Sequence, residues 1–279
     1  MKANGSSGMG ALTRRELIIG AGAAIGVAAC AQVGQQPINN INSSTGDIHM
    51  ARPTIVLVHG FWGDAAHWNK VIVQLTKMGY DSIRAVENPL SSLADDAART
   101  RKMVAQQKGP VLLVGHSYGG VVITEAGTLP NVVGLVYVAA FAPDAGESLV
   151  DVSKDYPAPG GASVAPDSDG YLWIDQRKFR ESFCHDLSAD EALAMAVTQK
   201  APLGSTAGDK VSTPAWRSKP SWYQVSSEDR MINPDNEKRM AARMSARKII
   251  TLAASHASLA SKPLEVSALI DEAAKATAT

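Results

Sequence analysis

Short apolar runs alternate with longer amphipathic segments along most of this chain. The short runs predict buried strands, and they lie at 53–58, 80–86, 111–114, 132–142, 221–227 and 248–254. Between them, apolar positions recur at helical spacing, which predicts helices over 68–78, 91–107, 118–129, 234–247 and from 263 onward. Strands that alternate with such helices indicate an α/β fold, a mostly parallel sheet of about six strands with helices on both faces.

One segment, residues 144–220, interrupts this alternation. It contains Pro-, Gly- and Ser-rich loops and two helical patterns, at 175–187 and 188–200, with no clear strand except around Leu172. A long insertion after a parallel strand lies where loops cover the carboxyl edge of the sheet. We therefore expect a helical lid over a site, inside one domain that spans 52–279.

The first 31 residues have the composition of an export signal. Paired Arg14 and Arg15 precede a mildly apolar run at 17–29, which is too short to cross a bilayer. This order resembles a twin-arginine signal, which would export the protein from a bacterial cytoplasm to the periplasm or the medium. The polar residues at 32–51 predict a flexible linker.

The end of the signal leaves two alternatives open. Val27-Ala28-Ala29-Cys30 resembles a lipobox, in which Cys30 would be lipidated and would anchor the protein to a membrane. Ala29-Cys30-Ala31 also fits the A-x-A site of a signal peptidase, which would release a soluble protein. The lipoprotein is slightly favoured.

Charge and composition narrow the classes of ligand. The chain has 27 basic and 27 acidic residues, and this balance gives no support to a nucleic-acid partner. Its two cysteines provide no disulfide framework, and no pair of its six histidines has the H-E-x-x-H spacing of a zinc helix. We therefore expect a small-molecule substrate and neither a metal nor a cofactor; the oligomeric state is not indicated.

The pattern Gly115-His116-Ser117-Tyr118-Gly119 joins a predicted strand to a predicted helix. G-x-S-x-G alone is a weak signal, but strand and helix supply the context of a nucleophile elbow. A turn sharp enough to expose Ser117 crowds the positions two before and two after it, and glycines there remove the clashing Cβ. Ser117 is thus the candidate nucleophile.

A serine hydroxyl needs a base that is itself oriented by a carboxylate. His256 follows the last predicted strand, and Asp229 follows the strand before it. Both therefore lie at the carboxyl edge of the sheet, in the chain order Ser, acid, His. Glu228 is the alternative acid, because neighbours at a strand end point to opposite sides.

The loop after the first strand, which begins at His59 and Gly60, is the candidate second half of an oxyanion hole. The backbone N–H groups of Phe61 and Tyr118 would donate to the oxygen of a tetrahedral intermediate. His59 is expected to support its loop through hydrogen bonds. Trp62 and His185 are candidates to line the substrate pocket.

These motifs together resemble the α/β-hydrolase superfamily. The segments IVLVHGFW, LLVGHSYGG, LVYVAAFAPDAGES, SSEDRMINP and SHASLASKP fall in the expected order over residues 54–263. The chain is similar to the bacterial esterase-like branch related to plant esterases and hydroxynitrile lyases. The resemblance implies the same residues for the triad, Ser117, Asp229 and His256, and the same two backbone donors.

Two departures bear on the reaction. Plant-type hydroxynitrile lyases carry a lysine after the catalytic histidine and a threonine after the strand histidine, where this chain has Ala257 and Gly60. Both differences favour hydrolysis over cyanohydrin cleavage, and we expect a serine hydrolase that cleaves carboxylic esters through an acyl-enzyme. Carbon–carbon bond hydrolysis, cyanohydrin cleavage or cofactor-free perhydrolysis by the same triad remain alternatives, as does a non-catalytic receptor for a small ligand.

Overall fold

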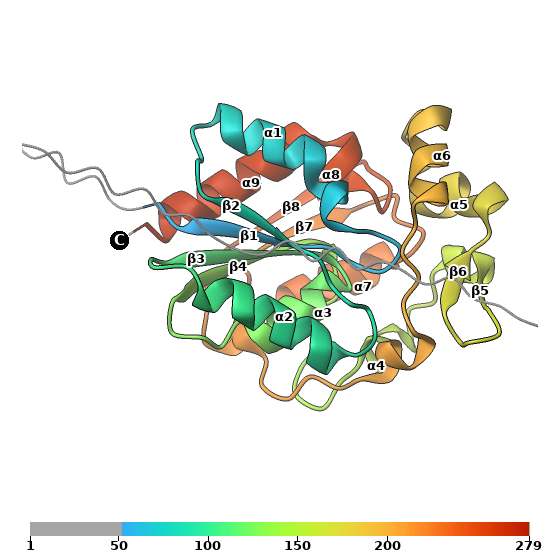
Figure 1. Cartoon of the computed structure of the whole chain (residues 1–279), viewed down its shortest axis with the longest axis horizontal. Helices are drawn as coiled ribbons and strands as arrows, with labels where there is room; N and C mark the ends of the chain where they lie inside the picture. The colour runs from blue at the N-terminus through green and yellow to red at the C-terminus, as the bar shows by residue number, and fades with distance from the viewer. Residues whose placement is uncertain (1–51, 279) are drawn as a thin grey trace, which may run out of the picture. The chain divides into compact units, whose positions relative to one another are not determined.

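The computed structural model describes residues 52–278 and contains a six-stranded, entirely parallel sheet (Figure 1). The strands follow the order β2-β1-β3-β4-β7-β8. Their bounds are β1 Thr54–Val58, β2 Ile83–Val86, β3 Val111–Ser117, β4 Val132–Ala140, β7 Ser221–Ser226 and β8 Lys248–Leu252. The prediction of an α/β sheet of about six strands is confirmed.

The central strands are apolar on both faces because helices cover both sides of the sheet. On one face α1 (Asn69–Lys77) packs against α9 (Pro263–Ala276), and on the other lie α2 (Leu93–Ala105), α3 (Gly119–Ala126) and α7 (Pro234–Arg243) (Figure 1). Successive side chains of β1 enter opposite cores: Ile55 and Leu57 face α1 and α9, and Val56 and Val58 face the other layer.

Helix ends differ from the predicted bounds where the local backbone changes. The short helices η1 (Ala65–Trp68) and α8 (Ser258–Ser261) precede α1 and α9. Helix α7 ends at Arg243, four residues before the predicted end at 247, and the chain then turns through Ser245, whose φ is +50°. A residue with left-handed backbone cannot continue a right-handed helix.

The insertion between β4 and β7 forms a layer beyond the carboxyl ends of the strands (Figure 1). Helices α5 (Gln176–Phe183) and α6 (Ala189–Val197) fall within the two helical patterns. Strand β6 (Leu172–Ile174) lies where the sequence indicated a strand, around Leu172, and it pairs antiparallel with β5 (Val164–Pro166), which the sequence did not predict. Short helices complete the insertion: α4 Leu149–Ser153, η2 Pro159–Ser163, η3 Gly204–Gly208 and η4 Ala215–Arg217.

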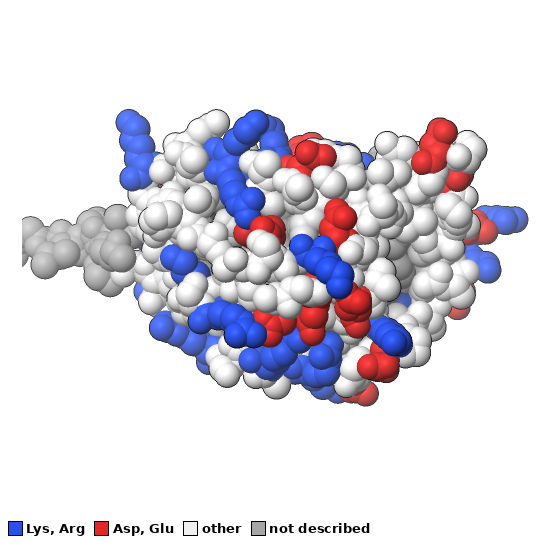
Figure 2. Space-filling view, turned by 90° about the horizontal axis from the view of Figure 1, so that it is seen from below, with Lys and Arg blue, Asp and Glu red and all other residues white. Residues whose placement is uncertain are grey.

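Charged side chains of both signs lie next to one another on the face that carries α2 (Figure 2). Arg101 of α2, for example, pairs with Glu125 of α3 at 3.0 Å.

No helix within residues 52–278 is long and apolar enough to cross a membrane. The predicted export signal at 1–31, Cys30 and the linker at 32–51 lie outside the described residues.

Candidate active site

Strand β3 ends at Ser117 in a strained turn at the carboxyl edge of the sheet. Ser117 has a φ of +54°, a left-handed conformation that costs a non-glycine residue about 1–3 kcal/mol. A Cβ added to Gly115 would lie 2.5 Å from the carbonyl oxygen of Gly119, and one added to Gly119 would overlap that of Val58. The two glycines thus allow the sharp turn that presents Ser117.

The structure brings Ser117, His256 and Asp229 together from the ends of β3, β8 and β7. The Oγ of Ser117 lies 2.9 Å from Nε2 of His256, and Nδ1 of His256 lies 2.6 Å from Oδ2 of Asp229. The side chains of His256 and Asp229 are fully buried. When Nδ1–H donates to the carboxylate, Nε2 is left as an acceptor for the serine proton.

Backbone donors hold Asp229 in this orientation. Its Oδ1 accepts hydrogen bonds from the N–H groups of Met231 and Ile232, at 2.7 and 2.9 Å, in the turn after β7. Glu228, the alternative acid, has an exposed side chain, and its carbonyl oxygen lies 3.0 Å from Nε2 of His185. Asp229 is therefore the carboxylate paired with His256, and His185 contacts the loop that carries it.

The loop after β1 lies directly against the elbow. A Cβ added to Gly60 would lie 2.6 Å from Cβ of Ser117 and 3.0 Å from the backbone nitrogen of Tyr118. Only glycine permits this approach, which brings the Phe61 backbone beside the start of α3. The rings of Phe61 and Tyr118 stack with centroids 4.1 Å apart. The candidate oxyanion loop and the elbow thus form one packed unit.

Asp96 supports Tyr118, a role that the sequence analysis did not assign. The hydroxyl of Tyr118 donates to Oδ2 of Asp96 at 2.8 Å, and the N–H of Leu90 donates to Oδ1. Burial raises the pKa of Asp96, although both hydrogen bonds oppose that shift. The sequence feature that could have identified Asp96 is its position on the inner face of α2, together with Leu93, Ala97 and Thr100.

Hydrogen bonds join His59 to its own loop and to the segment after β2. Its Nδ1 donates to the carbonyl of Gly60 and its Nε2 accepts from the N–H of Asn88, both at 2.9 Å. The amide of Asn88 donates in return to the carbonyl of His59. Burial lowers the pKa of His59, so the imidazole stays neutral and can make both bonds.

A second neutral histidine lies against His256. The Nε2 of His116 is 2.9 Å from the carbonyl oxygen of His256, and the two ring centroids are 4.8 Å apart. Burial lowers the pKa of His116 well below its ordinary value, so this ring donates without adding charge. Phe183 of α5 meets the His256 ring edge-on at 4.8 Å. His256 is therefore packed between the elbow and the insertion.

Trp62 connects the oxyanion loop to the insertion. Its φ is +58°, its indole N–H donates to the carbonyl of Leu172 at 2.8 Å, and its backbone N–H donates to that of Lys200 at 3.0 Å. Trp62 is buried. Its indole and backbone N–H groups both donate to backbone carbonyls of the insertion.

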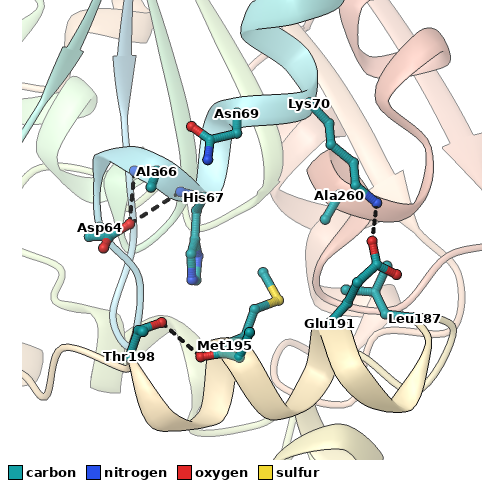
Figure 3. A pocket seen from close by; sticks show the side chains of 11 residues that line it. Asp64, Ala66, His67, Asn69, Lys70, Leu187, Glu191, Met195, Thr198 and Ala260 are labelled. Carbon is teal, nitrogen blue, oxygen red and sulfur yellow. Dashed lines mark hydrogen bonds and ion pairs between the residues drawn. The ribbon is translucent and has the colours of Figure 1, made fainter.

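A cavity of about 310 Å³ lies between α6 and the η1–α1 segment (Figure 3). His67 points into it towards Met195 and Thr198, and the Lys70–Glu191 ion pair, at 2.5 Å, lies at one side. Burial lowers the pKa of His67 to about 4. Ser117 does not line this cavity. The two sites are neighbours, because Phe183 packs on both His67 and His256.

This arrangement supplies a base-activated hydroxyl beside backbone N–H groups at a helix start, which suits attack on a carbonyl carbon. Among residues 52–278, no group of three or more His, Cys, Asp or Glu side chains is placed to hold a metal ion.

Comparison with known proteins identifies the family. The sequence pattern of the Alpha/beta hydrolase family matches residues 55–269. Alpha/beta hydrolase nvfD of Aspergillus novofumigatus is 28% identical over 252 residues, covering 81% of this chain and 98% of that protein. A pyrethroid hydrolase from Sphingobium faniae superposes with a TM-score of 0.68 at 20% identity, over 80% of this chain and 98% of its own.

Polyneuridine aldehyde esterase superposes with a TM-score of 0.69 at 19% identity, covering 80% of this chain and 99% of its own. At such identities the structural likeness establishes the fold, which agrees with the family match. The predicted resemblance to esterase-like α/β hydrolases is confirmed at the level of family and fold. This chain is a member of the α/β-hydrolase family.

Proposed function

We propose that this protein is a serine hydrolase that cleaves carboxylic esters through an acyl-enzyme intermediate. The observation that carries the proposal is the continuous relay from Ser117 Oγ to His256 Nε2, 2.9 Å, and from His256 Nδ1 to Asp229 Oδ2, 2.6 Å. The strained elbow and the tight approach of Gly60 to Ser117 support it further. Two proteins of the same fold are a pyrethroid hydrolase and an esterase by name.

In this mechanism Ser117 Oγ attacks the ester carbonyl while His256 Nε2 takes its proton. Asp229 stabilises the resulting imidazolium, and the N–H groups of Phe61 and Tyr118 bind the oxyanion. His256 then protonates the leaving alkoxide, which departs as an alcohol. Water, activated by the same imidazole, attacks the acyl-enzyme and releases the carboxylic acid. No metal or cofactor takes part in any step.

The direct test is Ser117→Ala in purified protein with p-nitrophenyl acetate. We expect turnover to fall by at least about 10³-fold, because the nucleophile is lost and only binding and oxyanion stabilisation remain. A fluorophosphonate probe should label the wild type and not the variant. Ser218→Ala, at an exposed serine of the insertion, is the matched control and should keep full activity and labelling. Equal turnover by Ser117→Ala and wild type would rule out the mechanism.

A series of esters with increasing acyl length would then define the substrate. Cyanohydrins, dienones and peracid formation belong in the same panel, because the relay is compatible with those reactions as well. Faster turnover of one of these than of every ester would assign that chemistry instead.

A further inference from the structure

A second carboxyl group, Glu237, is buried behind the triad acid and takes no part in the relay from Ser117 to Asp229. Glu237 lies on the inner face of α7, together with Met240 and Ala241, and is completely shielded from solvent. Its Oε2 accepts a hydrogen bond from the N–H of Ser226, at the end of β7, at 3.1 Å. The carboxyl is thus fixed next to the turn that presents Asp229.

The surroundings of Glu237 lack the donors that an ionised carboxylate needs. Its Oε1 is buried and receives no hydrogen bond from any N–H or O–H group of the described residues. The neighbouring cation, Lys238, pairs instead with Asp235 at 3.0 Å. A buried carboxylate with a single donor, the N–H of Ser226, and no partner charge is costly, so a neutral form is favoured.

The remaining ionisable neighbours favour the same protonation state. The carboxyl of Asp229 lies within hydrogen-bonding reach of Glu237. The hydroxyl of Tyr223, from β7, also faces this region, but it donates to the carbonyl of Ala140. Burial, reinforced by the negative charge of Asp229, raises the pKa of Glu237 well above its ordinary value. Two adjacent carboxyl groups are stable when they share one proton.

We propose that Glu237 is a positioning residue: as a neutral carboxylic acid it donates a hydrogen bond to Asp229 and holds that carboxylate towards His256. The inference rests on the proposed function, because Asp229 matters here as the partner of His256. The proton stays on Glu237 throughout the reaction. Glu237 therefore orients the triad acid without placing a second negative charge beside the imidazole.

This role predicts different outcomes for two variants of similar volume. Glu237→Gln keeps a donor at the same place and no charge, whereas Glu237→Met removes the donor. We expect Glu237→Met to lose about tenfold or more in kcat with little change in KM, because Asp229 and His256 lose their alignment. Without the hydrogen bond from Glu237, the negative charge of Asp229 is offset less and favours the charged imidazolium of His256 through space, so the acidic limb of kcat/KM should move to higher pH.

Glu237→Gln should keep most of the activity that Glu237→Met loses. The acidic limb of its kcat/KM profile should stay at the wild-type pH. An ionised Glu237 would give another result: its replacement by Gln would remove a negative charge near His256 and shift the acidic limb to lower pH. That shift would overturn the proposal, as would wild-type kcat and pH profile in Glu237→Met. Glu125→Gln, at a carboxylate paired with Arg101 away from the site, is the control for the substitution itself.

A spectroscopic test needs no turnover and no variant that perturbs folding. The infrared difference spectrum between wild type and Glu237→Gln at neutral pH should contain the carbonyl band of a protonated carboxylic acid. The Glu125→Gln difference spectrum should lack it, because burial raises the pKa of that carboxyl but hydrogen bonds from Ser212 and Arg101 outweigh burial and lower it. Absence of the band for Glu237 would overturn the proposal even in an active enzyme. Its presence in a protein without esterase activity would reject the proposed function and leave the protonation state standing.

Discussion

At the scale of single residues, the site depends on close backbone approaches that leave no room for a side chain. Gly60 is one such position, because a Cβ added there would lie within 3.0 Å of Cβ of Ser117, the carbonyl oxygen of His116 and the nitrogen of Tyr118. In the proposed mechanism the N–H of the next residue, Phe61, donates to the oxyanion. The proposed oxyanion loop can therefore approach the elbow this closely only when residue 60 has no side-chain methyl group.

Gly60→Ala should lower kcat by about 10²-fold while the protein remains folded, because the added methyl displaces the oxyanion loop by a fraction of an ångström or more. Steady-state kinetics with p-nitrophenyl acetate measure the loss. Gly161→Ala is the matched control, since nothing lies within 4 Å of its added Cβ. Equal activity of the two variants would show that Phe61 contributes no oxyanion stabilisation.

The sequence identifies residues that carry chemistry more readily than the residues that hold them. Ser117, Asp229 and His256 each follow an apolar run, in an order that one reaction class requires. Asp96 and Glu237 instead lie in the first turns of helices, where carboxylates are common partners of the helix dipole. Their positions on the apolar faces of α2 and α7 distinguish them, but burial and the resulting pKa shifts become evident only when the helices are packed.

At the scale of elements, the insertion is joined to the oxyanion loop as well as covering it. Both the indole and the backbone N–H of Trp62 donate to carbonyls of the insertion, from Leu172 and Lys200. Movement of the β5–β6 hairpin would therefore be transmitted to the residue after Phe61. The sequence indicated a strand only around Leu172; β5 escaped prediction because three residues are too few for a period of two to be recognised.

Trp62→Phe keeps the ring and removes the indole donor. Loss of this hydrogen bond should cost about 1 kcal/mol of the free energy that attaches the hairpin to Trp62. We expect kcat/KM to fall about fivefold, the factor to which that free energy corresponds. Hydrogen exchange of the amides in Leu172–Ile174 should become faster. Trp216→Phe removes a comparable bond to the carbonyl of Pro143, away from the oxyanion loop, and should spare kcat/KM. If both variants lose activity equally, Trp62 has no particular connection to the site.

At the scale of the whole molecule, the sheet and its flanking helices follow from hydrophobic periodicity, whereas the position of the insertion does not. The central strands β1, β3, β4 and β7 are buried on both faces and could pack in few other ways. The insertion contacts the body through residues far apart in sequence, such as Lys200 with Glu87 and Phe183 with His256. A single sequence contains no periodic signal for such pairings. The contacts that the insertion makes with the site therefore become evident only in the structure.

Two kinds of contact join the insertion to the body, and they contribute differently to the free energy of unfolding. Lys70 and Glu191 are both nearly half exposed, so their ion pair should contribute less than about 1 kcal/mol. Phe183 is fully buried among aromatic and imidazole rings, and Phe183→Ala should lower the free energy of unfolding by about 3–5 kcal/mol. Urea denaturation of Phe183→Ala and Lys70→Ala compares the two. A loss in Lys70→Ala as large as that in Phe183→Ala would mean that charge pairing, and not apolar packing, holds the lid against His256.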